Sequence, residues 1–152
     1  MRELSPHSGS KGILGGDGWS HFHDVLNYAK EAENREEYVE TARRRRSTPL
    51  EVATADFFHP PEICSIDVSR YHGHVGDVIE VTVVDNVSVA SVGVLIVDEA
   101  GRLVEMGSAT LRSGDYWSYV ATKNAKTKHV RVIVDAADLP GHLSEKRVEK
   151  EV

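Results

Sequence analysis

The fold of this chain is decided between Gly76 and Asp135, where short runs alternate apolar and polar residues. The clearest runs are VIEVTVV (78–84), VGVLI (92–96), WSYVA (117–121) and VRVIV (130–134). Successive side chains of a strand point to opposite faces, so every second residue lines one side of a sheet. The pattern predicts an all-β domain with a buried face formed by Ile79, Val81, Val83, Val92, Val94, Ile96, Trp117, Tyr119, Ala121, Val130, Val132 and Val134.

Turn residues separate the expected strands. The predicted strands are 63–71, 78–84, 89–97, 103–111, 116–122 and 129–135, with a further candidate at 146–152. Between them lie Gly76-Asp77, Asp85-Asn86, Asp98–Gly101 and Ser113–Asp115, all rich in residues that favour turns. Six or seven short strands over roughly 90 residues suit an antiparallel β-sandwich. We therefore place Trp117 and Tyr119 in its core rather than in a ligand groove.

Helical spacing replaces this alternation upstream of the strands. Residues 1–19 are rich in glycine and predict a flexible tail, and Ser20 is a suitable cap for a long helix beginning near His21. Thr48-Pro49-Leu50-Glu51 is typical of a second, shorter helix that opens with a capping box. The expected organisation is a tail (1–19), a helical extension (20–58), a sandwich (59–145) and a charged C-terminal end (146–152).

Several segments of the β region resemble a known family. They are Pro61-Glu62-Ile63, Tyr71-His72-Gly73, GRLVEMG (101–107), Trp117-Ser118-Tyr119 and AADLPGH (136–142). Together they resemble bacterial immunoglobulin-like or fibronectin type III-like β-sandwich domains, and above all uncharacterised bacterial proteins with a short helical segment before one such sandwich. His142 stands where these domains often have asparagine. The resemblance implies an immunoglobulin-like sandwich with an N-terminal helical extension, and it implies no active site.

Composition narrows the classes of function. The 152 residues are 40% hydrophobic and 28% charged, with a formal net charge of −6, which disfavours general binding to nucleic acid or to anionic membranes. Cys64 is the only cysteine, so no intrachain disulfide forms. No apolar run reaches the roughly 18–20 residues of a membrane span, and no secretory signal opens the sequence. We expect a cytoplasmic protein.

No catalytic motif accompanies these features. The sequence has eight histidines, but the loop pair His72 and His74 lacks the further ligands at recognised spacing that a zinc site needs. A calcium site formed by Asp85, Asn86, Asp135 and Asp138 at one end of the sandwich is a weaker alternative. We expect no enzyme activity, no cofactor and no bound metal.

The most concentrated charge is Arg43-Arg44-Arg45-Arg46. These four arginines follow a glutamate-rich helix, so a solvated helix end explains them, although they are also candidate contacts for a polyanion or a partner. The predicted function is a non-enzymatic protein-interaction or structural module whose partner is another protein. The alternatives are polyanion or nucleic-acid binding through Arg43–Arg46, and a metal-binding protein or enzyme using the loop histidines. Self-association through the helical extension is also open.

Overall fold

The computed structural model describes residues 16–152, with side chains from His23 onward. Within that range lie three helices and eight strands. The chain divides after Phe58 into a helical unit and a sandwich. None of the described helices combines the length and the apolar composition needed to cross a membrane. The tail expected at 1–19 falls outside the described residues up to position 15, and positions 16–19 are helical.

The helical unit comprises α1 (Gly16–Ala32), α2 (Glu36–Arg45) and α3 (Pro49–Phe57). The expected long helix is thus two helices, and the first begins at Gly16 rather than near His21. They separate at residues 33–35, where the apolar stripe is too thin to bury a continuous helix. The predicted capping box of α3 is confirmed, because Thr48 Oγ1 accepts from the Glu51 N–H and the Glu51 carboxylate accepts from the Thr48 N–H, both at 3.1 Å.

A buried polar contact joins α2 to α3 within this unit. The Tyr38 hydroxyl donates to Asp56 Oδ2 at 2.8 Å and also contacts the Tyr28 hydroxyl of α1. Both Tyr38 and Asp56 are fully buried. Burial and these two contacts raise the pKa of Tyr38 well above its usual range, so its hydroxyl stays protonated as a donor.

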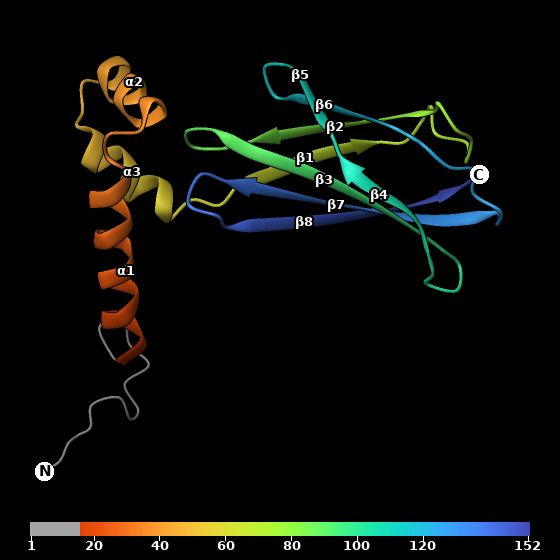
Figure 1. Cartoon of the computed structure of the whole chain (residues 1–152), viewed down its shortest axis with the longest axis horizontal. Helices are drawn as coiled ribbons and strands as arrows, with labels where there is room; N and C mark the ends of the chain where they lie inside the picture. Colours follow the sequence, from red (N-terminus) through yellow and green to blue (C-terminus); the bar gives the residue numbers. More distant parts are fainter. Residues whose placement is uncertain (1–15) are drawn as a thin grey trace, which may run out of the picture. The chain divides into compact units, whose positions relative to one another are not determined.

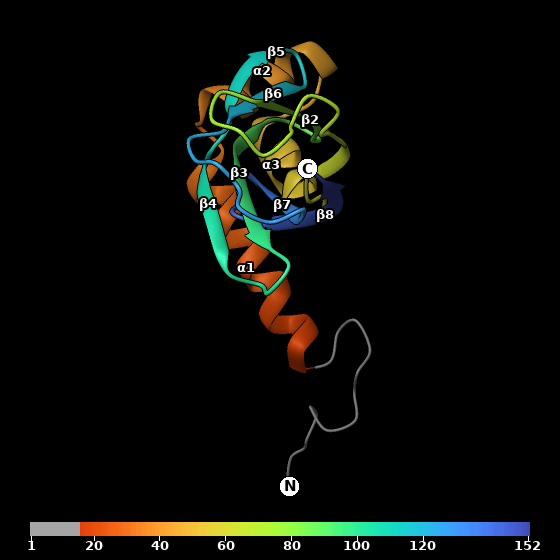
Figure 2. The ribbon, with the colours of Figure 1, turned by 90° about the vertical axis from the view of Figure 1, so that its right-hand side faces the viewer.

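The sandwich consists of two antiparallel four-stranded sheets that lie face to face (Figure 1). The first sheet has the order β1-β2-β6-β5, with β1 (Glu62–Asp67), β2 (Val78–Val84), β5 (Thr110–Ser113) and β6 (Tyr116–Val120). The second sheet has the order β4-β3-β7-β8, with β3 (Val89–Asp98), β4 (Leu103–Ser108), β7 (His129–Asp138) and β8 (Leu143–Glu151). Figure 2 shows the two layers nearly end-on. The prediction of a mainly-β antiparallel sandwich with N-terminal helices is confirmed.

The alternation of the sequence produces the core as predicted. Every residue of the expected inward set is buried, from Ile79 at 0% exposure to Trp117 at 8%. Trp117 and Tyr119 therefore fill the space between the sheets. On one side the sandwich is closed by β8, since Ser144 Oγ donates to the Pro61 carbonyl at 2.5 Å and Lys146 Nζ to the Cys64 carbonyl at 3.3 Å.

Two strand assignments differ from the expectation. The run predicted as one strand, 103–111, is divided between β4 of the second sheet and β5 of the first, with the small side chain of Ala109 buried where the chain changes sheets. The charged end expected after residue 145 belongs to β8, which starts at Leu143 and pairs with β7 along its length. An edge strand that faces water keeps many charged residues, so its alternation is weak in the sequence.

Candidate functional site

The loop histidines do not assemble a ligand set. The backbone N–H groups of His72 and His74 donate to Asp77 Oδ2 at 2.7 and 3.0 Å, and both side chains are exposed. These bonds lower the pKa of Asp77, because they stabilise its charged form. In the part of the chain that the structure describes, no histidine belongs to a group of three or more donor side chains close enough to share an ion.

The four aspartate and asparagine residues considered for calcium are not gathered into one site. Asp138 accepts from the backbone N–H of Gly141 at 2.9 Å and of His142 at 2.7 Å, so it caps a turn. Asp85 lies within 4.8 Å of it and accepts from two backbone N–H groups of its own loop. Asp135 instead stands in mid-strand on β7. Asp85 Oδ1 is buried without a hydrogen-bond partner, but the oxygens of two carboxylates fall short of the 6–8 oxygen ligands that calcium takes.

The arginine cluster lies at the C-terminal end of α2, and all four side chains are exposed. Arg43 forms an ion pair with Glu40 at 2.6 Å, and Arg44 donates to the Thr41 hydroxyl at 3.2 Å. Arg46 ends the helix in the left-handed conformation, with φ 55°. The arginines oppose the negative end of the helix dipole, which is the arrangement expected of a solvated helix end.

A buried carboxylate on β4 was not predicted from the sequence. Glu105 is 3% exposed, and its Oε1 accepts from the Tyr119 hydroxyl at 2.7 Å and from the Thr122 N–H and hydroxyl at 2.8 and 2.9 Å. Its Oε2 accepts from the Lys123 N–H at 3.2 Å. Glu105 thus ties β4 to β6 of the other sheet and to the segment after it. Burial, together with Glu105, raises the pKa of Tyr119 to about 12.

Gly107 is required beside this contact. A Cβ at Gly107 would lie 2.9 Å from the Tyr119 ring, closer than real Cβ atoms approach. The ring thus packs against β4 where a side chain is missing, and its hydroxyl reaches Glu105. The position of β4 at the edge of the second sheet therefore depends on Glu105 and Gly107.

The outer face of the second sheet carries an apolar row that crosses three strands. Strand register places Met106 of β4 opposite Leu95 of β3, and Leu95 opposite Ile133 of β7. Met106 is 66% exposed, and Leu95 and Ile133 are partly exposed. In the next row, Val97 lies between Leu103 and Arg131. The outer face therefore presents contiguous apolar side chains to solvent.

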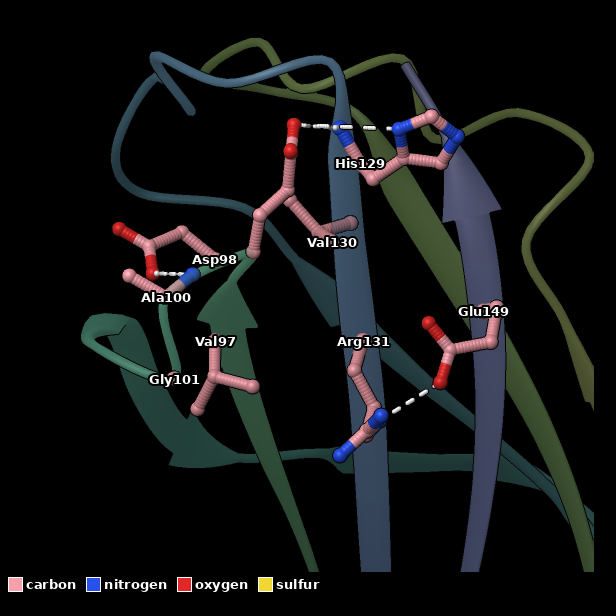
Figure 3. A pocket seen from close by; sticks show the side chains of 9 residues that line it. Val97, Asp98, Ala100, Gly101, His129, Val130, Arg131 and Glu149 are labelled. Atoms are coloured by element: carbon pink, nitrogen blue, oxygen red, sulfur yellow. Dashed lines mark hydrogen bonds and ion pairs between the residues drawn. The ribbon is translucent and has the colours of Figure 1, made fainter.

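Ion pairs border these rows on the side of β8. Arg131 pairs with Glu149 at 2.6 Å, and Arg147 pairs with Glu145 at 2.7 Å. Figure 3 shows Arg131 and Glu149 pointing toward one another from neighbouring strands, with Val97 beside them. A hollow of about 490 Å³ opens here between the β3–β4 hairpin and β8. The apolar rows are thus flanked by charges that are already compensated.

The outer face of the first sheet is different. Its central row runs through Asp67, Glu80, Ser118 and Thr110, all of them polar. Glu80 is further engaged by Arg70 at 2.9 Å. The exposed Tyr116 and Val120 stand on either side of this row, at the two ends of β6. Val78 of β2 pairs with Val120, so the apolar residues on the outer face of the first sheet lie toward the ends of its strands and its central row is polar.

Comparisons with known proteins add a similarity of fold. No family model and no curated protein sequence matches the chain. Among solved structures it is similar to CopC from Methylosinus trichosporium OB3b, with 18% sequence identity and a TM-score of 0.45, over 59% of this chain and 89% of that chain. A similarity at this level carries no argument about function, so the function has to be inferred from the surface.

Proposed function

We propose that this protein is a non-enzymatic protein-interaction module that binds another protein through the outer face of its second sheet. The observation that supports this most is the row Met106–Leu95–Ile133, which leaves apolar side chains in contact with water. Contiguous exposed apolar surface of this kind is typical of interaction sites, whereas single exposed apolar residues need no explanation.

The surroundings of the row favour a protein partner. The apolar residues stand on paired strands rather than on loops, so a partner meets a surface that needs little ordering on binding. The compensated pairs Arg131–Glu149 and Arg147–Glu145 form a polar border beside them. An apolar centre with a polar rim is the usual anatomy of a protein interface.

A matched pair of exposed apolar residues tests the proposal. Met106 stands on the edge strand of the second sheet, and Leu111, 51% exposed, on the edge strand of the first. A photo-crosslinking amino acid at position 106 should trap a partner in cells of the source organism, and the same group at position 111 should not. The trapped protein is then identified by mass spectrometry and purified.

Affinity measured with the two purified proteins decides the outcome. Met106→Ser should weaken binding by about 1.5 kcal/mol or more, because a buried methionine side chain contributes on that order. Leu111→Ser should leave the affinity unchanged. Equal affinities for wild type and Met106→Ser would refute this location for the binding surface.

A further inference from the structure

The outer face contains a hollow where a side chain is missing from the centre of the second sheet. Gly93 of β3 forms its floor, and a Cβ there would lie only 2.9 Å from Asp135 Oδ1. The hollow has a volume of about 360 Å³, and Leu95, Met106 and Ser108 also line it. Register places Ser108 and Asp135 on either side of Gly93, in the row next to Met106 and Leu95. Ser108 and Asp135 thus form two opposite polar walls of the hollow, and Met106 and Leu95 form an apolar wall between them.

The charge in this hollow is not compensated within the sandwich. Asp135 is exposed, and across residues 16–152 no hydrogen bond or ion pair engages its carboxylate. Its cross-strand neighbour is another carboxylate, Glu145, whose own partner is Arg147 at 2.7 Å. Because Arg147 already compensates Glu145, the charge without a partner is that of Asp135, and a cation placed there would gain an ion pair.

The shape of the hollow favours a long cationic side chain over a free ion. An aliphatic stem can lie against Leu95 and Met106, whose side chains stand beside the hollow. The Asp135 carboxylate belongs to an exposed residue, and a carboxylate suits the two parallel N–H groups of a guanidinium. Ser108, opposite Gly93 on β4, offers a hydroxyl as a further acceptor at the other wall of the hollow.

We infer that the Gly93 hollow binds an arginine side chain of the partner protein, as the polar anchor of an interface whose apolar part is the Met106–Leu95–Ile133 row. The inference rests on the proposed function, because it names the residue chemistry that the same surface recognises. Asp135 holds the guanidinium, the missing side chain of Gly93 leaves room for the Asp135 carboxylate itself, and Leu95 and Met106 contact the stem of the arginine.

A titration followed by NMR of the full chain tests this inference without knowledge of the partner. The probe is the blocked tripeptide acetyl-Leu-Arg-Leu-amide, and the control is the same peptide with citrulline, which keeps the shape of arginine but lacks its charge. The arginine peptide should shift the amide signals of Gly93, Ser108 and Asp135 in a saturable way. Asp135→Asn should weaken binding about tenfold, since it removes a charge-assisted pair. Asp115→Asn, at an exposed turn of the other sheet, should not change it.

Three results would overturn the inference. They are no saturable shift at Gly93, equal binding of the citrulline peptide, and equal binding by the Asp135→Asn variant. If these appear while Met106→Ser still weakens binding of the identified partner, the arginine site is wrong and the interaction surface stands. Concentration-dependent self-association that Asp135→Asn abolishes, seen by analytical ultracentrifugation, would assign the hollow to a second copy of this chain and reject the separate partner. Gly93→Ala, whose Cβ would displace the Asp135 carboxylate, should reproduce the loss seen with Asp135→Asn.

Discussion

Replacement of Glu105 by glutamine is the most informative test of how β4 is held in place. The glutamine carbonyl can keep the position of Oε1 and its three bonds, from the Tyr119 hydroxyl and the Thr122 N–H and hydroxyl. Its NH2 group then occupies the position of Oε2 and faces the Lys123 N–H, so a bond of 3.2 Å is replaced by two opposed donors. With the charge also lost from the remaining bonds, we expect Glu105→Gln to lower the free energy of unfolding by about 2 kcal/mol. Glu105→Ala leaves all four donors without this acceptor and should lower the free energy of unfolding by about 3–4 kcal/mol.

Urea unfolding of the whole chain measures both changes. The fluorescence of Trp117, which is buried, reports on the sandwich, and a Trp19→Phe background removes the second tryptophan. Glu80→Gln, a partly exposed glutamate in the first sheet, is the control and should change stability by less than about 0.5 kcal/mol. If Glu105→Gln unfolds at the same urea concentration as wild type with the same slope, the buried carboxylate does not stabilise the fold and the argument fails.

Other substitutions test separate contacts. Gly107→Ala should destabilise the sandwich by about 1–3 kcal/mol in the same urea assay, because its Cβ would lie 2.9 Å from the Tyr119 ring; an unchanged midpoint would contradict this packing. Tyr38→Phe removes the donor to Asp56 and should lower helical stability by about 1–2 kcal/mol, followed by the circular dichroism signal at 222 nm on heating. Backbone bonds lower the pKa of Asp77 in the folded protein, so its stabilising contribution is present above the unfolded pKa and is lost as pH falls through the folded one. The urea midpoint of wild type should therefore fall below pH about 4, and Asp77→Asn should reduce the drop between pH 7 and pH 3.

The features that local sequence predicts correctly depend on neighbouring residues. Alternation identified the inward set, and the Thr48 capping box requires only residues three positions apart. The break between α1 and α2 was not predicted. Helical spacing alone does not show at which residue a sparse row of apolar side chains becomes too weak to hold one continuous helix. The start of β8 was predicted at residue 146 instead of Leu143, and the segment was assigned to a charged C-terminal end. An exposed edge strand shows little apolar alternation in its sequence.

The candidate binding surface on the second sheet could not be predicted from local sequence patterns. Asp135 was considered with Asp138 for calcium, yet three residues along a strand place the two on opposite faces. Nothing in the local sequence marks Gly93 as part of a hollow. Met106 is recognised as part of an apolar row only because the strand register places it opposite Leu95. The buried Glu105 reads in the sequence as an ordinary polar residue of an edge strand.

From the sequence alone we could predict that the chain forms a sandwich, which side chains of the strands point inward, and where α3 begins. Strand alternation and helix caps depend on residues only two to four positions apart. The order of the strands within each sheet follows only from the tertiary structure. The change of sheet at Ala109, the bonds to Glu105 and the row from Met106 to Ile133 arise from pairings between distant segments. Such pairings depend on how two sheets close over a common core, and so the proposed binding surface could be recognised only in the folded molecule.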